Sequence, residues 1–124
     1  MKTYVGVRND PDPVTVEVHT SSRKRPLRHI PFHSPSGFEW GFQGSGPADL
    51  ALSILVDYLK ERPPYGGWKN RLFSKWTVHS KAWKYHQDFK RDFVAKWSVA
   101  WMLHDQEIDT WLKEQEEQDA DSTT

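Results

Sequence analysis

The chain has 124 residues, no cysteine, and 17 basic side chains balanced by 17 acidic ones. The length predicts one domain with its own core, and the lack of cysteine excludes disulfides, thiolate metal sites and a cysteine nucleophile. With no apolar run of about 18 residues and no signal-like first segment, the sequence predicts a cytoplasmic protein that makes no membrane contact.

Charge is distributed unevenly along the chain. Residues 65–100 contain eight Lys or Arg against two Asp or Glu, and residues 101–124 contain one against eight. This asymmetry predicts a surface whose charge has a direction, and the acidic end then either lies solvated or imitates nucleic-acid phosphates. The alternative is that the basic stretch and the acidic end neutralise each other within the fold.

The first segments of the chain have the pattern of strands. TYVGV at 3–7 and VTVEV at 14–18 are short, alternating and β-branched, and the turn formers between them indicate a hairpin with a long loop. Residues 26–33 can extend only at a sheet edge or as coil, because Pro26 and Pro31 lack a backbone donor.

A further strand and a helix are expected next. GFEWGF alternates, so a strand over 38–42 would place Phe38, Trp40 and Phe42 on one face. From 47 to about 60 the apolar residues recur with a helical period, and two prolines follow. This segment predicts the first helix.

The second half reads mainly as helix. Residues 71–78 suit either a strand or an irregular aromatic-rich connection. From about residue 82, rings recur at every fourth position, which predicts one helix with the rings packed inside; they are Tyr85, Phe89, Phe93, Trp97 and Trp101. A last helix is expected over 105–118.

These elements predict an α+β fold. A small antiparallel N-terminal sheet is packed by the helix at about 47–60, and a mainly helical C-terminal half follows. Residues 1–118 are expected to form the single domain. Residues 119–124 are expected to be an acidic disordered tail, because they contain no apolar residue long enough to anchor them.

The glycine turn before the first helix is a candidate anion site. Backbone N–H groups at a helix start hold phosphates, so Gly44, Ser45, Gly46 and Ala48 are candidate ligand-binding residues for a phosphate or nucleotide. The turn lacks the Lys-Ser/Thr pair of a P-loop and the third glycine of a dinucleotide fingerprint. The alternative is that Ser45 or Gly46 caps the helix and the glycines let the chain turn sharply.

The histidines offer a weaker candidate for chemistry. His19, His29 and His33, with Glu39, supply groups for a metal site or for acid–base catalysis. Their spacing matches no zinc pattern, and Pro31 separates two of them. We therefore predict no metal, no cofactor and no catalytic residue, and retain an enzyme that uses His33 and Glu39 as an alternative hypothesis.

The basic stretch interleaves cations with aromatic rings. Cations for phosphates and rings for base stacking are typical of single-stranded nucleic-acid binding, and exposed Trp beside Lys or Arg is also typical of protein interfaces. The competing interpretation is that the rings belong to the core. The candidate partner-binding residues are Trp68, Lys69, Arg71, Lys75, Trp76, Lys81, Trp83, Lys84 and Arg91.

One long segment resembles a known family. HSPSGFEWGFQGSGPADLALSIL is similar to a small bacterial and phage family of unknown function, whose hallmark is a serine–proline turn, a GFEWGY-like strand and GSGPAxLAL at a helix start. The matching positions are Ser34, Pro35, Gly37, Phe38, Glu39, Trp40, Gly41, Gly44, Ser45, Gly46, Pro47, Ala48, Leu50 and Ala51. The segments YHQDFKRDFVAKW and EIDTWL also resemble its C-terminal helices.

The resemblance implies an accessory role on a phage, a plasmid or in a bacterium, such as interference with host defence, and it carries no catalytic residue. With the basic–aromatic stretch, it leads us to expect a non-enzymatic protein that binds a protein or nucleoprotein partner, with nucleic acid as a further candidate. A phosphate- or nucleotide-binding protein that uses the glycine turn is the alternative.

Overall fold

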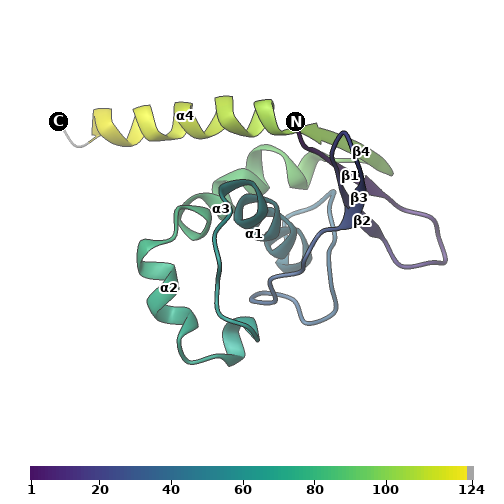
Figure 1. The fold of residues 1–124 in the computed structure, drawn as a ribbon, viewed down its shortest axis with the longest axis horizontal. Coiled ribbons are helices and arrows are strands. Elements are labelled where there is room, and N and C mark those ends of the chain that lie inside the picture. Colours follow the sequence, from purple (N-terminus) through teal and green to yellow (C-terminus); the bar gives the residue numbers. More distant parts are fainter. Residues whose placement is uncertain (123–124) are drawn as a thin grey trace.

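The computed structural model describes residues 1–122 as one layer of sheet beside a group of helices (Figure 1). The four strands are β1 (Thr3–Val7), β2 (Thr15–His19), β3 (Lys24–Pro26) and β4 (Ala100–His104). They pair in the order β3-β2-β1-β4, and every pair is antiparallel. The predicted hairpin and the α+β class are confirmed.

The sheet buries one face because its strands alternate. Tyr4, Val16 and Val18 point into the core from the hairpin, and Trp101 and Leu103 do so from β4. Opposite Trp101, the chain has Gly6, where a Cβ atom would lie 2.2 Å from the indole nitrogen. A larger residue there would displace the Trp101 ring from the sheet.

The central helix is α1 (Ser45–Leu59), which confirms the helix expected at about 47–60. Every residue from 46 to 56 is buried, so this helix is enclosed on all sides rather than on one stripe. It packs most extensively against α3 (Lys81–Asp92). The core therefore lies between the sheet, α1 and α3.

The remaining elements surround this core. They are η1 (Gly67–Lys69), α2 (Phe73–His79), η2 (Val94–Lys96) and α4 (Asp105–Ser122). Figure 1 shows α4 running from β4 across α3 and extending beyond the rest of the fold. Residues 71–78, for which a strand was one of two interpretations, lie mostly in the short helix α2.

The strand expected over 38–42 is absent from the structure. Gly41 has a φ of +89°, which interrupts the extended backbone, and its N–H donates to the carbonyl of Val94. Trp40 is buried and donates its indole N–H to the carbonyl of Ser98, whereas Phe42 is half exposed. Alternating rings therefore reflect the packing of an irregular loop against η2, and the prediction was wrong.

The prediction of one helix carrying the fourfold-spaced rings was also wrong. α3 ends at Asp92, and the chain passes through η2 into β4, where Trp101 lies. The rings are nevertheless packed: Tyr85, Phe89 and Trp101 are buried, and Phe93 and Trp97 are partly buried against the core. A fourfold spacing therefore identified buried residues without identifying their secondary structure.

The C-terminal helix is longer than expected. α4 continues through Ser122, so positions 119–122 of the predicted disordered tail are helical, and 123–124 lie outside the described residues. None of the helices described within residues 1–122 has the length and apolar character that crossing a membrane requires.

Candidate functional site

The glycine turn before α1 is closely packed. The first residue of α1 is Ser45, and Gly44 is its N-cap without a side-chain hydrogen bond. Gly46 and Ala48 are buried, and a Cβ on Gly46 would lie 2.8 Å from the Cβ of Glu39. The turn thus has a packing role, and a carboxylate-bearing residue lies against the place where an anion would enter.

Asp49 lies on the second helical turn of α1. Its side chain fixes residues 32–34, which precede the glycine turn in the sequence. Its carboxylate is fully buried and accepts hydrogen bonds from the backbone N–H groups of Phe32, His33 and Ser34, at 3.3, 2.7 and 2.9 Å. The ring of His29 donates to the same carboxylate at 2.7 Å. Asp49 therefore satisfies four donors that would otherwise be lost inside the protein.

The buried His86 and the partly buried His33 form a hydrogen-bonded pair next to the segment that Asp49 holds. The His86 Nδ1–H donates to the carbonyl of Trp83 at 2.6 Å, which leaves its Nε2 as an acceptor for the Nε2–H of His33 at 2.9 Å. Burial lowers the pKa of His86 from 6.5 to about 4, and burial also lowers the pKa of His33. Both rings are neutral at physiological pH.

The structure does not assemble the acid–base site considered from the sequence. Glu39 forms an ion pair with Arg8, whose hydrogen bond holds the pKa of that carboxyl below its usual value, while His33 turns to His86. His19 bonds Glu17 on β2. Within residues 1–122, no group of three His, Cys, Asp or Glu side chains is arranged to hold a metal ion.

Three of the predicted partner-binding cations lie in ion pairs. Lys81 contacts Glu116 at 2.6 Å and Lys84 contacts Asp119 at 3.0 Å, so α3 and α4 neutralise each other along their contact. Arg91 contacts two carboxylates of its own helix, those of Asp88 and Asp92. We call the contact formed by Lys81, Lys84, Glu116 and Asp119 the α3–α4 seam. In this seam the basic stretch and the acidic end of the chain partly neutralise each other, which is the alternative interpretation of the uneven charge.

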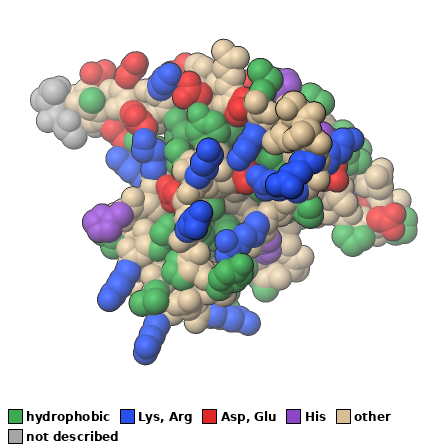
Figure 2. All heavy atoms as spheres, viewed as in Figure 1, with side chains coloured by type: hydrophobic (Ala, Val, Ile, Leu, Met, Phe, Trp, Pro, Cys, Tyr) green, Lys and Arg blue, Asp and Glu red, His purple; other side chains and the backbone are tan. Residues whose placement is uncertain are grey.

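Other cations have no such partner. Among residues 1–122, six exposed cations around the C-terminal end of α1, the loop that follows it and α2 have no carboxylate within 4.0 Å. We call this set the basic face: Arg28, Lys60, Arg62, Lys69, Arg71 and Lys75. Figure 2 shows Lys and Arg side chains spread over this side of the molecule, whereas Asp and Glu side chains gather along α4.

A cavity of about 390 Å³ opens on the basic face, and Arg28, Lys60 and Arg62 are among the residues that line it. Its two acids are already engaged. Burial would raise the pKa of Asp57, but hydrogen bonds from Tyr4 and Arg25 hold it below its usual value. Glu61 accepts hydrogen bonds from Ser80 and from the N–H of Ala82, at the start of α3. Lys2 and Arg25, which also line the cavity, pair with Asp57, whereas Arg28, Lys60 and Arg62 remain without a carboxylate partner among residues 1–122.

Exposed rings lie among these cations. Tyr65 is 82% exposed with the Arg28 guanidinium 4.5 Å from its ring centre, and Trp68 is 54% exposed with Lys69 Nζ 5.6 Å from its ring. The other two candidate tryptophans, Trp76 and Trp83, are both partly buried against the core. Trp68 is thus the candidate tryptophan that reaches solvent most freely.

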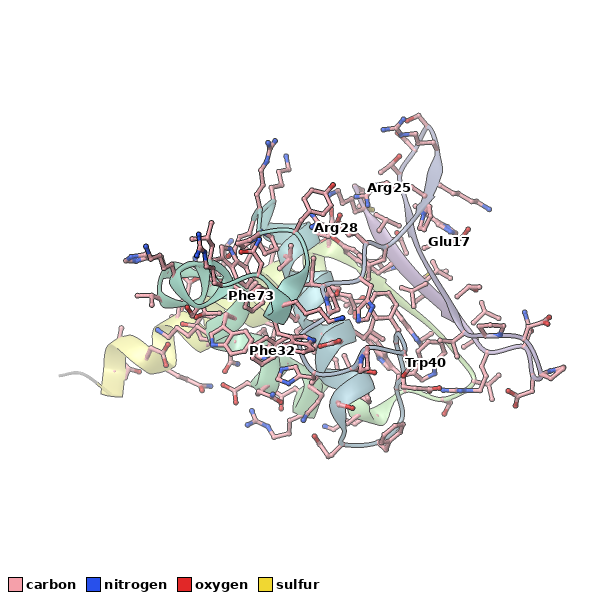
Figure 3. The ribbon with its side chains drawn as sticks, turned by 90° about the horizontal axis from the view of Figure 1, so that it is seen from below. Glu17, Arg25, Arg28, Phe32, Trp40 and Phe73 are labelled. Atoms are coloured by element: carbon pink, nitrogen blue, oxygen red, sulfur yellow. The ribbon has the colours of Figure 1, made fainter. Side chains whose placement is uncertain are left out.

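Beside Trp68 lies a second cavity, of about 230 Å³. Its inner walls are Phe32, Phe73 and Trp83, and Arg71 stands at its edge. Phe32 stacks on Phe73 at 5.2 Å and meets Trp83 edge-on at 4.6 Å. Phe32 and Phe73 lie next to each other in Figure 3, and Trp40 lies well apart from them. We call this cavity the aromatic pocket.

The structure thus brings together part of the predicted set. Trp68, Lys69, Arg71 and Lys75 share the basic face, and Trp83 lines the aromatic pocket. Sequence analysis missed Arg28, Lys60 and Arg62, which come from two segments outside the basic stretch. The local signals were the basic run RKRPLR, which ends at Arg28, and the KER sequence after α1.

Comparison with known proteins identifies a family. A family of unknown function (DUF6166) matches residues 4–80, which is more than half of the chain. The matched range includes all six cations of the basic face and ends before α3, β4 and α4. The search of curated proteins and the search of solved structures each found no match. The chain belongs to this family of unknown function, DUF6166.

Proposed function

We propose that the protein acts by binding the acidic surface of a macromolecule, a protein or nucleoprotein, through the basic face. The observation that supports this proposal is the set of six exposed cations that have no carboxylate within 4.0 Å among residues 1–122. Cations gathered on one side repel one another, so the cluster does not stabilise the fold. An acidic partner would turn that repulsion into attraction.

The distribution of the acids supports the same conclusion. The chain has as many acidic as basic residues, yet three acids of α4 are paired with lysines of α3 or of α4 itself: Asp109, Glu116 and Asp119. The two acids beside the basic cavity bond Tyr4, Arg25 and the start of α3. The neutral total therefore coexists with a local positive field, and such fields steer acidic partners toward a surface.

Binding is better supported than catalysis. The groups that would act as acid or base are occupied: Glu39 by Arg8, and His86 by the carbonyl of Trp83 and by His33. An anion site at Gly44–Ala48 is also less well supported, because Gly46 and Ala48 are buried and Glu39 lies against Gly46. In this proposal the accessory role in a phage, plasmid or bacterium, directed against host defence, would be carried out by binding alone.

Retention on immobilised heparin, a sulfated polyanion without bases, tests the proposal. Because the formal net charge of the chain is zero, retention requires a local positive surface rather than a net charge. We expect the wild type to be retained and the double variant Arg62→Glu/Lys75→Glu to elute at much lower salt.

The matched control is Lys96→Glu/Lys113→Glu, which changes the net charge by the same amount. Lys96 lies in η2 at the far end of α3, a helix about 18 Å long, and Lys113 lies on α4. The control should elute with the wild type. Equal elution of both double variants, or no retention of the wild type, would contradict the proposal.

A further inference from the structure

We infer that the partner of the basic face is single-stranded nucleic acid, and that one of its bases enters the aromatic pocket against Trp68. This inference rests on the proposed function, since the same cations would hold the phosphates. It assigns a ligand class to the pocket, which the proposed function leaves open.

The small volume and the aromatic walls of the pocket suit a flat, ring-shaped ligand group. Its volume of about 230 Å³ lies below the range of about 300–1,000 Å³ that is typical of pockets for drug-sized ligands, which leaves room for a single ring system. The inner rings of Phe73 and Trp83 are fixed by contacts with Phe32, and the outer ring of Trp68 is accessible. Stacking on such rings accepts every base, because each base has a π-face.

The polar rim of the pocket suits an anionic backbone. No Asp or Glu is among the residues that line it, and Arg71 has no carboxylate within 4.0 Å among residues 1–122. Lys69 and Arg71 stand on either side of Asn70, whose side chain is held by the Tyr65 carbonyl and the Leu72 N–H. A bound base would therefore contact rings inside the pocket and one unpaired cation, Arg71, in its wall, with Lys69 beside the outer ring of Trp68.

Charge and rings continue away from the pocket. Arg28 stacks on the exposed ring of Tyr65, and the basic cavity with Lys60 and Arg62 lies on the same side. Proteins bind single-stranded nucleic acid through surfaces on which cations and aromatic rings alternate: the cations contact the phosphates, and the bases stack on the rings. The bases of a duplex are paired and stacked inside it, so none can enter the pocket unless it flips out of the duplex.

An acidic protein is the competing partner, and the observations favour it less. A protein would satisfy the cations with carboxylates, but it would need an aromatic anchor of its own to fill the pocket. A nucleic-acid strand supplies the charge and the ring in every nucleotide. The pocket and the cations are adjacent, so one short strand spans both.

The experiment compares three labelled DNA probes of equal length by fluorescence anisotropy: a single strand, the same strand with abasic sugars, and a duplex. Wild-type protein should bind the single strand about tenfold more tightly than the abasic strand, since stacking one base contributes about that factor. The duplex should bind no better than the abasic strand.

Variants separate the pocket from the cations. Trp68→Ala should lower affinity for the single strand to the abasic level and leave abasic binding unchanged, whereas Trp68→Phe should keep most of the difference. The matched control is Phe42→Ala, which removes a ring of similar exposure, 51% against 54%, that is not among the residues lining the aromatic pocket. Melting curves confirm that each variant is folded.

The outcomes distinguish this inference from the proposed function. Equal affinity for the single and abasic strands, tighter duplex binding, or full single-strand binding by Trp68→Ala would overturn the base pocket. If these results occur while Arg62→Glu/Lys75→Glu still weakens heparin retention, the basic face keeps its proposed function and the acidic-protein partner takes the place of nucleic acid. Absence of any nucleic-acid binding would overturn the inference in the same way.

Discussion

The α3–α4 seam and the basic face differ in how their charges are matched. In the seam, Lys81 and Lys84 meet Glu116 and Asp119, and Tyr85 also donates to Asp119. On the basic face, Lys60, Arg62 and the other four cations meet no carboxylate among residues 1–122. The two regions show that a neutral chain can use its acids to build the fold on one side and leave a charged surface on the other.

A similar contrast separates the buried polar groups from the basic face. Asp49, His33 and His86 have their hydrogen bonds satisfied inside the protein, so they should determine stability. The cations of the basic face should determine binding and leave stability almost unchanged. Two measurements of stability test this division.

Replacing Asp49 should produce the largest loss. Asp49→Ala removes the acceptor of one buried and two partly buried N–H groups and of the His29 ring, and leaving a buried donor unpaired costs about 1–3 kcal/mol when no water reaches it. We expect urea unfolding to show a loss of at least about 3 kcal/mol.

Ser53→Ala is the matched control for Asp49. The Ser53 hydroxyl accepts one hydrogen bond, from the N–H of Ile30 at 2.9 Å, on the same helix and toward the same segment. Its loss should be about 1 kcal/mol. If Asp49→Ala were no more destabilising than Ser53→Ala, the role of the Asp49 carboxylate as the acceptor that holds residues 32–34 would be contradicted.

The histidine pair predicts a smaller, pH-dependent loss. The pKa of His86 is about 4 in the folded protein and 6.5 when unfolded, so the unfolded chain binds the proton first as pH falls. Stability present above pH 6.5 is therefore lost as pH falls toward 4, by about 1 kcal/mol between pH 7 and pH 5.5. His33 has its pKa lowered by burial and acts in the same direction.

This pH window separates the histidines from the carboxylates. Asp57 and Asp92 have pKa values held below 3.8 by hydrogen bonds from their partners despite partial burial, so their contributions are lost only in more acidic solution. His86→Gln should reduce the difference between the urea midpoints at pH 7 and pH 5.5. An unchanged difference in this variant would show that His86 is not the group being protonated.

The parts of the fold that local patterns encode were predictable. The hairpin follows from two alternating segments, and α1 follows from its helical apolar period. β4 was missed because residues 100–104 form a strand only by pairing with β1, almost the whole chain away, and their rings continue a fourfold spacing. The loop at 38–42 was misread because its rings alternate in sequence like those of a strand, while Gly41 turns the backbone and leaves Phe42 half exposed.

The candidate site was predictable to the extent that it is local. Trp68, Lys69, Arg71 and Lys75 lie close together in sequence, so their density revealed them. Arg28 and Lys60 reach the same surface only through the packing of β3 and α1, which no local pattern records. The neutralisation of Lys81 and Lys84 depends on where α4 packs, and the sequence left that alternative open.

The most direct test of the central claim is to map where an anionic macromolecule contacts the protein. Amide chemical shifts would be recorded while a short heparin-derived oligosaccharide is added to the full chain. We predict changes confined to Arg28, residues 60–62 and residues 68–75. Changes centred on the α3–α4 seam would contradict the account, and changes centred on residues 44–48 would do so in favour of an anion site at the start of α1.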